Sequence, residues 1–176
     1  MESEQARTIK VLQLAVQMEV DGKEFYQKAS RKSSNQLARE LFRQLANEED
    51  IHRKRFEEIY KVLRRGQSWP DVEPPFEKGK RIKSLFAEAS RTLGTNFKIA
   101  ESELEAIKTA MDMEIRSYNL YHSRSAESAL PVEKQFYKTL AGEERGHHLA
   151  LLDSYEYLSD PAGWFTKKEH WSLDGA

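Results

Sequence analysis

Two segments of this sequence each carry a glutamate followed three residues later by a histidine. They are LANEEDIH (45–52), with Glu49 and His52, and LAGEERGH (140–147), with Glu144 and His147. Residues three apart share one face of an α-helix, so each pair could reach one metal ion through a carboxylate oxygen and an imidazole nitrogen. Both pairs fall on the apolar stripe of their helix, which faces the core. An unpaired charge there is costly, so the pattern predicts a partner for these side chains.

The two segments belong to a longer internal repeat. MEVDGKEFY (18–26) aligns with MEIRSYNLY (113–121) by the same shift of 95 residues that aligns the two Glu-x-x-His segments. Since one gapless shift aligns both helices of each half, we interpret the halves as two copies of one helical hairpin. Paired about a pseudo-two-fold axis, the copies would bring matching residues to one place.

The repeat predicts a single site of four glutamates and two histidines. Its residues are Glu19, Glu49, His52, Glu114, Glu144 and His147. One glutamate from each of two helices and a Glu-x-x-His from each of the other two form the ligand set of di-iron and di-manganese carboxylate bundles. Two divalent cations would offset four buried carboxylates, and oxygen and imidazole ligands suit Fe(II) and Mn(II). We therefore expect two divalent ions, either iron or manganese, or zinc in a purified or crystallised sample; the resemblance described below implies two Fe ions.

Four further side chains could support these ligands. Tyr26 and Tyr121 each lie seven residues after a predicted ligand glutamate, and each is either a core tyrosine or a hydroxyl bonded to a ligand carboxylate. Glu48 and Glu143 are either surface charges or acceptors for the second N–H of the histidine on the opposite helix, which metal-bound histidines usually require. The sequence leaves both alternatives open.

Four long segments with helical periodicity must position these residues. Helices are expected at about 4–31, 35–65, 96–126 and from Pro131 to the stop at Asp160. A break rich in proline and glycine follows the second helix, and a short helix is expected within it at 80–92. No segment alternates at period two over a useful length, so we expect no strands. Short links make each helix pair antiparallel, while the long connection lets the second pair cross the bundle.

These features predict an all-α protein, a ferritin-like antiparallel four-helix bundle with one long crossover between the second and third helices. We expect a single domain over 1–176, with hairpins at about 5–65 and 96–160, the crossover at 66–95 and a C-terminal tail at 161–176. The tail is aromatic, and we expect it to be irregular and to pack across the bundle or against a partner.

Composition limits the other classes of function. The chain has no cysteine, which excludes disulfides, thiolate metal sites and a thiol nucleophile. A formal net charge of −1 gives no basic field for nucleic acid. No apolar run approaches the roughly 20 residues of a membrane helix, and the N-terminus does not resemble a signal peptide. We expect a soluble cytoplasmic protein with no nucleic-acid or membrane partner, and a homodimer.

At these residues the chain resembles the rubrerythrin-like branch of the ferritin-like superfamily, over about residues 5–160. The repeated Glu…Glu-x-x-His pattern and the tail segment DPAGWF…EHWSLDG carry the resemblance. It implies that Glu49 and Glu144 bridge both metals. The remaining ligands would each bind one metal, namely Glu19, Glu114, His52 and His147.

The chain departs from rubrerythrins proper in two respects. They carry a second glutamate one turn after the terminal ligand on the third helix, where this chain has Ser117, so the site is closer to the symmetrical pattern of bacterioferritins. Ser117 and its repeat partner Gly22 could ease helix contact or leave room above the metals for an oxygen ligand. Rubrerythrins also carry a cysteine-ligated rubredoxin domain, so electrons here are expected from a separate donor such as a rubredoxin-type protein, or from a small reductant.

The resemblance implies a di-iron oxidoreductase of the peroxidase or oxidase type, which reduces hydrogen peroxide or dioxygen and serves in oxidative stress. One alternative is a ferroxidase or iron-handling protein that uses the same residues. Another is a non-catalytic, metal-stapled bundle that acts as a sensor or adaptor through its aromatic tail.

Overall fold

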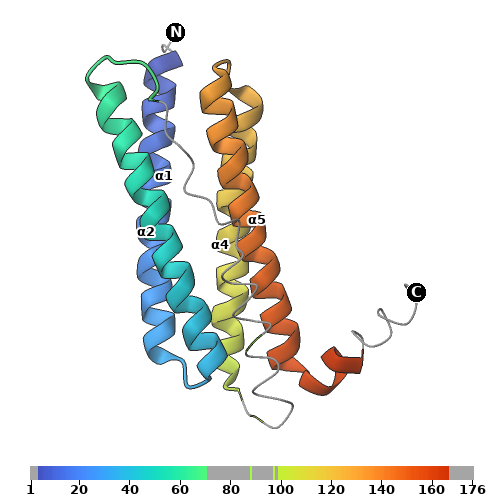
Figure 1. Ribbon diagram of the computed structural model, residues 1–176. Coiled ribbons are helices and arrows are strands. Elements are labelled where there is room, and N and C mark those ends of the chain that lie inside the picture. Colours follow the sequence, from blue (N-terminus) through green and yellow to red (C-terminus); the bar gives the residue numbers. More distant parts are fainter. Residues whose placement is uncertain (1–3, 71–87, 89–96, 98, 167–176) are drawn as a thin grey trace.

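In the computed structural model, described over residues 4–70, 88, 97 and 99–166, long helices form a bundle (Figure 1). They are α1 (Glu4–Lys32), α2 (Gln36–Arg64), α4 (Glu101–Glu127) and α5 (Pro131–Ser159). The described ranges contain no strand. α1 packs mainly against α2, and α4 against α5, so the two predicted hairpins are the two halves of the bundle. The prediction of an all-α, ferritin-like bundle is confirmed.

The order of the helices requires one long crossover. α2 ends at one end of the bundle and α4 begins at the opposite end (Figure 1). The connection between them must therefore span the length of the molecule. The short helix predicted at 80–92 lies outside the described residues except for Glu88, which is helical. Within the described part of the chain, no helix is long and apolar enough to cross a membrane.

Local sequence determines several helix ends. The Asn35 side chain accepts a hydrogen bond of 3.1 Å from the backbone N–H of Ala38 and so caps α2. α2 ends before Gly66, whose φ of 73° is a conformation that favours glycine. Pro131 occupies the first turn of α5, where its missing N–H costs no hydrogen bond.

Two predictions were wrong, the start of the third long helix and the irregular conformation of the tail. α4 begins at Glu101 rather than near residue 96, because the backbone of Ala100 is extended, with φ −75° and ψ 142°. The tail is helical rather than irregular over 161–166. The Asp160 carboxylate accepts the backbone N–H of Gly163 at 3.0 Å and caps this turn. The turn carries the buried Trp164 into edge contact with Tyr157, with ring centroids 5.5 Å apart.

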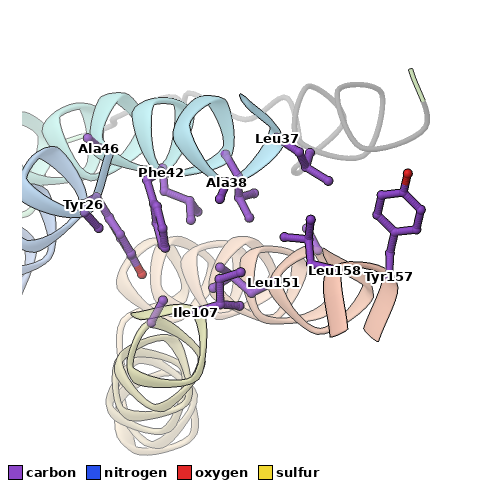
Figure 2. Close-up of a cluster of buried hydrophobic side chains, with 14 of the residues drawn as sticks. Tyr26, Leu37, Ala38, Phe42, Ala46, Ile107, Leu151, Tyr157 and Leu158 are labelled. Carbon is purple, nitrogen blue, oxygen red and sulfur yellow. The ribbon is translucent and has the colours of Figure 1, made fainter. Parts of the chain in front are cut away.

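Two apolar clusters occupy the two ends of the bundle core. Figure 2 shows one of them, in which side chains of α2 such as Leu37 and Phe42 face Leu151 and Leu158 of α5. The second cluster has Phe56, Tyr121, Tyr137 and their neighbours at its centre. Between the clusters, the inward positions of all four long helices are glutamates and histidines. The apolar ends therefore have to stabilise a fold whose middle is polar.

A buried carboxylate joins the turn between α1 and α2 to the start of α4. Glu103 accepts hydrogen bonds from the backbone N–H of Asn35 at 3.0 Å and the hydroxyl of Ser34 at 2.9 Å. It also accepts the backbone N–H of Ala100 at 3.3 Å. Burial raises the pKa of Glu103, but these hydrogen bonds outweigh burial and lower the pKa below its usual value. The carboxylate therefore holds the two hairpins together at this end.

We expect the Glu103→Ala substitution to lower the free energy of unfolding by about 1–3 kcal/mol, because it leaves the buried N–H of Asn35 without a partner. Urea denaturation followed by circular dichroism measures this change. The pKa of Glu103 is lower in the folded state than in the unfolded chain. The stabilisation by its carboxylate is therefore complete above the pKa that Glu103 has in the unfolded chain, and it is lost as the pH falls through the pKa that Glu103 has in the folded state. The difference in the free energy of unfolding between variant and wild type should therefore shrink on acidification.

The control is Glu105→Ala on the same helix, because the side chain of Glu105 is 60% exposed. This substitution should change the free energy of unfolding by no more than about 0.5 kcal/mol. Equal destabilisation by the two variants at neutral pH would contradict the role assigned to Glu103.

Candidate metal centre

The structure brings all six predicted metal ligands together in the middle of the bundle. Each of the four long helices contributes inward-facing residues, and all six side chains are buried: Glu19, Glu49, His52, Glu114, Glu144 and His147. The rings of His52 and His147 are stacked, with their centroids 5.8 Å apart. The six residues related by helical spacing and by the repeat therefore lie in one buried cluster.

One side of the cluster is built around His52. Its Nδ1 atom lies 3.2 Å from Glu144 Oε1, 3.5 Å from Glu19 Oε2 and 4.0 Å from Glu49 Oε2. Three carboxylates from three helices thus face one imidazole nitrogen.

The other side is built around His147. Its Nδ1 atom lies 3.3 Å from Glu114 Oε2 and 3.9 Å from Glu144 Oε2. Glu144 therefore approaches one histidine with each of its two oxygens. Glu49 also belongs to both sides, because its carboxylate lies within 4.8 Å of candidate ligand atoms on each. These two glutamates occupy the middle of the cluster, between the two histidines.

The two tyrosines bond to glutamates of the opposite hairpin. Tyr26 donates its hydroxyl proton to Glu114 Oε1, and Tyr121 donates to Glu19 Oε1. Of the two interpretations left open, the structure has the hydrogen-bonded one. The partner is not the glutamate seven residues earlier, because two helical turns separate these residues by about 10 Å along the axis. The bonds leave the Oε2 atoms of both glutamates facing the cluster.

Glu48 and Glu143 lie behind His147. Glu48 Oε2 is 2.7 Å from His147 Nε2, which fixes the ring so that Nδ1 faces the cluster. Glu143 is buried, which excludes the interpretation as a surface charge. Its carboxylate lies with Glu48 and His147 in a group whose candidate ligand atoms are within 4.8 Å of one another. Both glutamates therefore belong to the surroundings of the cluster.

Gly22 lies against a central glutamate. A Cβ atom at Gly22 would be 3.4 Å from Cδ of Glu49. This is an ordinary van der Waals distance, so Gly22 lies directly beside Glu49. Ser117, at the matching position of α4, is partly buried.

Six buried atoms of the cluster have no hydrogen-bond partner in the described part of the protein. They are Oε2 of Glu19 and Glu114, both carboxylate oxygens of Glu144, and Nδ1 of His52 and His147. Buried polar atoms normally have partners, since each unsatisfied group is costly. Their concentration at one point, with only oxygen and nitrogen donors, fits a site for non-haem iron or manganese.

The electrostatics of the cluster favour bound positive charge. Burial, followed by the charge of Glu19, raises the pKa of Glu49 well above its usual value. Burial lowers the pKa of His52, but Glu144 and Glu19 outweigh this effect and raise it to about 10. The carboxylates therefore attract cations strongly, and two divalent ions would neutralise them.

Comparison with known proteins agrees with this site. The family model described as Rubrerythrin matches residues 10–155, a range that contains all six residues of the cluster. The chain shows no significant match to any curated protein or solved structure.

We expect divalent cations to stabilise the fold, because ions that bind only the folded protein shift the unfolding equilibrium. At a free-ion concentration 100 times the Kd, the gain is about 2.7 kcal/mol. Thermal unfolding after treatment with EDTA, with and without added Mn(II), measures the shift. The double variant Glu19→Gln, Glu114→Gln should lose most of it. An unchanged Tm in the wild-type protein would contradict cation binding at this cluster.

Proposed function

The chain belongs to the Rubrerythrin family, and we propose that it is a di-iron protein that reduces hydrogen peroxide or dioxygen. Members of this family bind non-haem iron. The observation that carries the proposal is the set of six buried oxygen and nitrogen atoms that face one another and have no hydrogen-bond partner among the described residues. No other group of described residues combines so many metal-ligating atoms with full burial.

In this proposal each side chain has a defined role. Glu49 and Glu144 hold both ions, which agrees with their place between the two histidines. The Oε2 atoms of the two terminal glutamates and the Nδ1 atoms of the histidines each hold one ion. Tyr26 and Tyr121 fix the terminal glutamates through their hydroxyl groups.

When bound, a ferrous pair would supply the two electrons that, together with two protons, reduce hydrogen peroxide to water. The protein contributes position, because Glu49 and Glu144 would hold the two ions close together in a buried site. Glu48 contributes by orienting His147. An electron donor outside the metal centre supplies the electrons for the next turnover.

The bridging roles predict a change in metal content. The wild-type chain should bind two ions, and Glu144→Ala should bind one or fewer, because the substitution removes the carboxylate that approaches both histidines. Elemental analysis after Mn(II) or Fe(II) loading measures the stoichiometry. The control is Glu127→Ala, whose side chain is 60% exposed and which should retain two ions. Two ions in Glu144→Ala would show that Glu144 does not bridge.

The activity can be tested by loading the chain anaerobically with Fe(II) and mixing it with peroxide or air in a stopped-flow spectrometer. One oxidant should produce ferric absorption within a single fast phase. Glu48→Ala should lower the rate or the iron affinity about 10–100-fold, since it removes the support of a ligand histidine.

The same measurements separate the alternative functions. A cage-sized particle in light scattering, together with repeated oxidation of added Fe(II), would favour iron handling over reduction of an oxidant. Bound iron that reacts with neither peroxide nor air would overturn the proposal.

A further inference from the structure

The outer surfaces of the two hairpins differ, although the repeat relates them position by position. On the first hairpin, charged side chains of α1 and α2 form ion pairs with one another. Oδ1 of Asp50 lies 2.6 Å from Nζ of Lys23 and 3.0 Å from Nη2 of Arg53. Oδ2 of Asp50 lies 2.8 Å from Nζ of Lys54, and Arg53 also pairs with Glu57. The charges on this surface are therefore largely neutralised within the hairpin.

The matching surface of the second hairpin is apolar and aromatic. A shift of 95 residues converts the positions of Lys23, Arg53, Lys54 and Glu57 into those of Tyr118, His148, Leu149 and Leu152. Leu149 is 42% exposed, and so is Ile115 of α4. α4 and α5 lie side by side here (Figure 1), with Nδ1 of His148 3.4 Å from the backbone oxygen of Met111. The surface formed by Ile115, Tyr118, Leu149 and Leu152 is called the α4/α5 face.

The outward side of α5 presents one line of residues along this face. They are Lys138, Gly142, Arg145, Leu149, Asp153 and Glu156, at helical spacings of three and four residues. All of them are exposed except Asp153, which is half-buried. A Cβ atom added to Gly142 would meet nothing within 4 Å. Another helix can therefore come close to the backbone of α5 at this position.

The charges along this line change sign at Leu149. Lys138 and Arg145 precede it, whereas Asp153 and Glu156 follow it. None of these four forms an ion pair with another described residue, in contrast to the paired charges of the first hairpin. The line therefore has one basic half and one acidic half, with an exposed leucine between them.

Such a line is complementary to a second copy of itself. Arg145 and Asp153 each lie four residues from Leu149. When two α5 helices pack antiparallel about a two-fold axis at Leu149, each Arg145 lies opposite Asp153 of the other copy. Leu149 then meets Leu149 of the other copy at the axis. An isologous contact requires this self-complementary pattern, whereas a contact with a different protein does not.

We propose that the α4/α5 face binds a second copy of the chain, with the two α5 helices antiparallel about a two-fold axis beside Leu149. Ile115, Leu149 and Leu152 form the apolar centre of the interface, and their burial supplies affinity. The pairs between Arg145 and Asp153 on both sides of the axis set the register. None of these residues is a predicted metal ligand, so the inference does not rest on the proposed function.

The position of the axis can be tested by cross-linking, because the natural chain has no cysteine. In the full chain with Leu149→Cys, the two thiols lie next to each other across the axis, and a short bifunctional maleimide should link the two copies. The matched control is Leu14→Cys on α1, since Leu14 is 51% exposed but lies on the first hairpin. It should remain unlinked on a denaturing gel. Equal linking of the two variants, or no linking of Leu149→Cys, would overturn the proposal.

Analytical ultracentrifugation of the full chain measures the association itself. The wild-type chain should be a dimer, and Leu149→Glu should raise the Kd about 30-fold or more, because it places two carboxylates at the apolar centre. Leu14→Glu is the control and should leave the Kd unchanged. A monomeric wild-type chain, or equal Kd values for the two variants, would overturn the proposal.

Charge reversal tests the register of the two helices. Arg145→Glu and Asp153→Arg should each raise the Kd about 10-fold or more, because each places like charges opposite one another. The double variant should return the Kd towards that of the wild type, since both pairs form again with their signs exchanged. Circular dichroism and metal content after Mn(II) loading establish that each variant is folded. Single variants without effect, or a double variant weaker than either, would show that this register is wrong.

Discussion

Repulsion among four carboxylates in one small volume is the constraint on which the rest of this structure depends. Glu19, Glu49, Glu114 and Glu144 meet where a helical bundle would ordinarily place apolar side chains. Unpaired charge at that depth is costly, so the site requires compensating positive charge. The apolar clusters at both ends have to supply the stability that the middle of the core does not. The bundle is therefore organised around a centre that compensating positive charge stabilises.

The sequence was sufficient to predict that the six candidate ligands lie close together, for a physical reason. Glu49 and His52 lie on one helix, so helical spacing alone shows that they share a face. The gapless repeat then relates them to Glu144 and His147, and short links make the helices of each hairpin antiparallel. Helical spacing is a local relation, and the repeat relates the two hairpins by symmetry. Neither the spacing nor the repeat requires knowledge of how distant side chains pack.

Contacts between distant residues could not be predicted in the same way. Asn35 and Glu103 are 68 positions apart, and the start of α4 depends on where Glu103 lies. The same limit applies to Glu143, whose burial depends on a neighbouring helix. The ring contacts between Trp69 and Tyr137 join a loop residue to a helix, and no periodic pattern relates such positions. The repeat shows that Tyr137 in the second hairpin occupies the position of Phe42 in the first, but it does not show which residues surround Tyr137.

The exchange of tyrosine hydroxyl groups between the hairpins has a consequence for how the centre can be altered. Tyr26 belongs to the first hairpin but fixes a glutamate of the second, and Tyr121 does the reverse. A change in either tyrosine therefore disturbs a glutamate of the opposite hairpin rather than one of its own. Each half of the cluster therefore depends on a residue of the opposite hairpin.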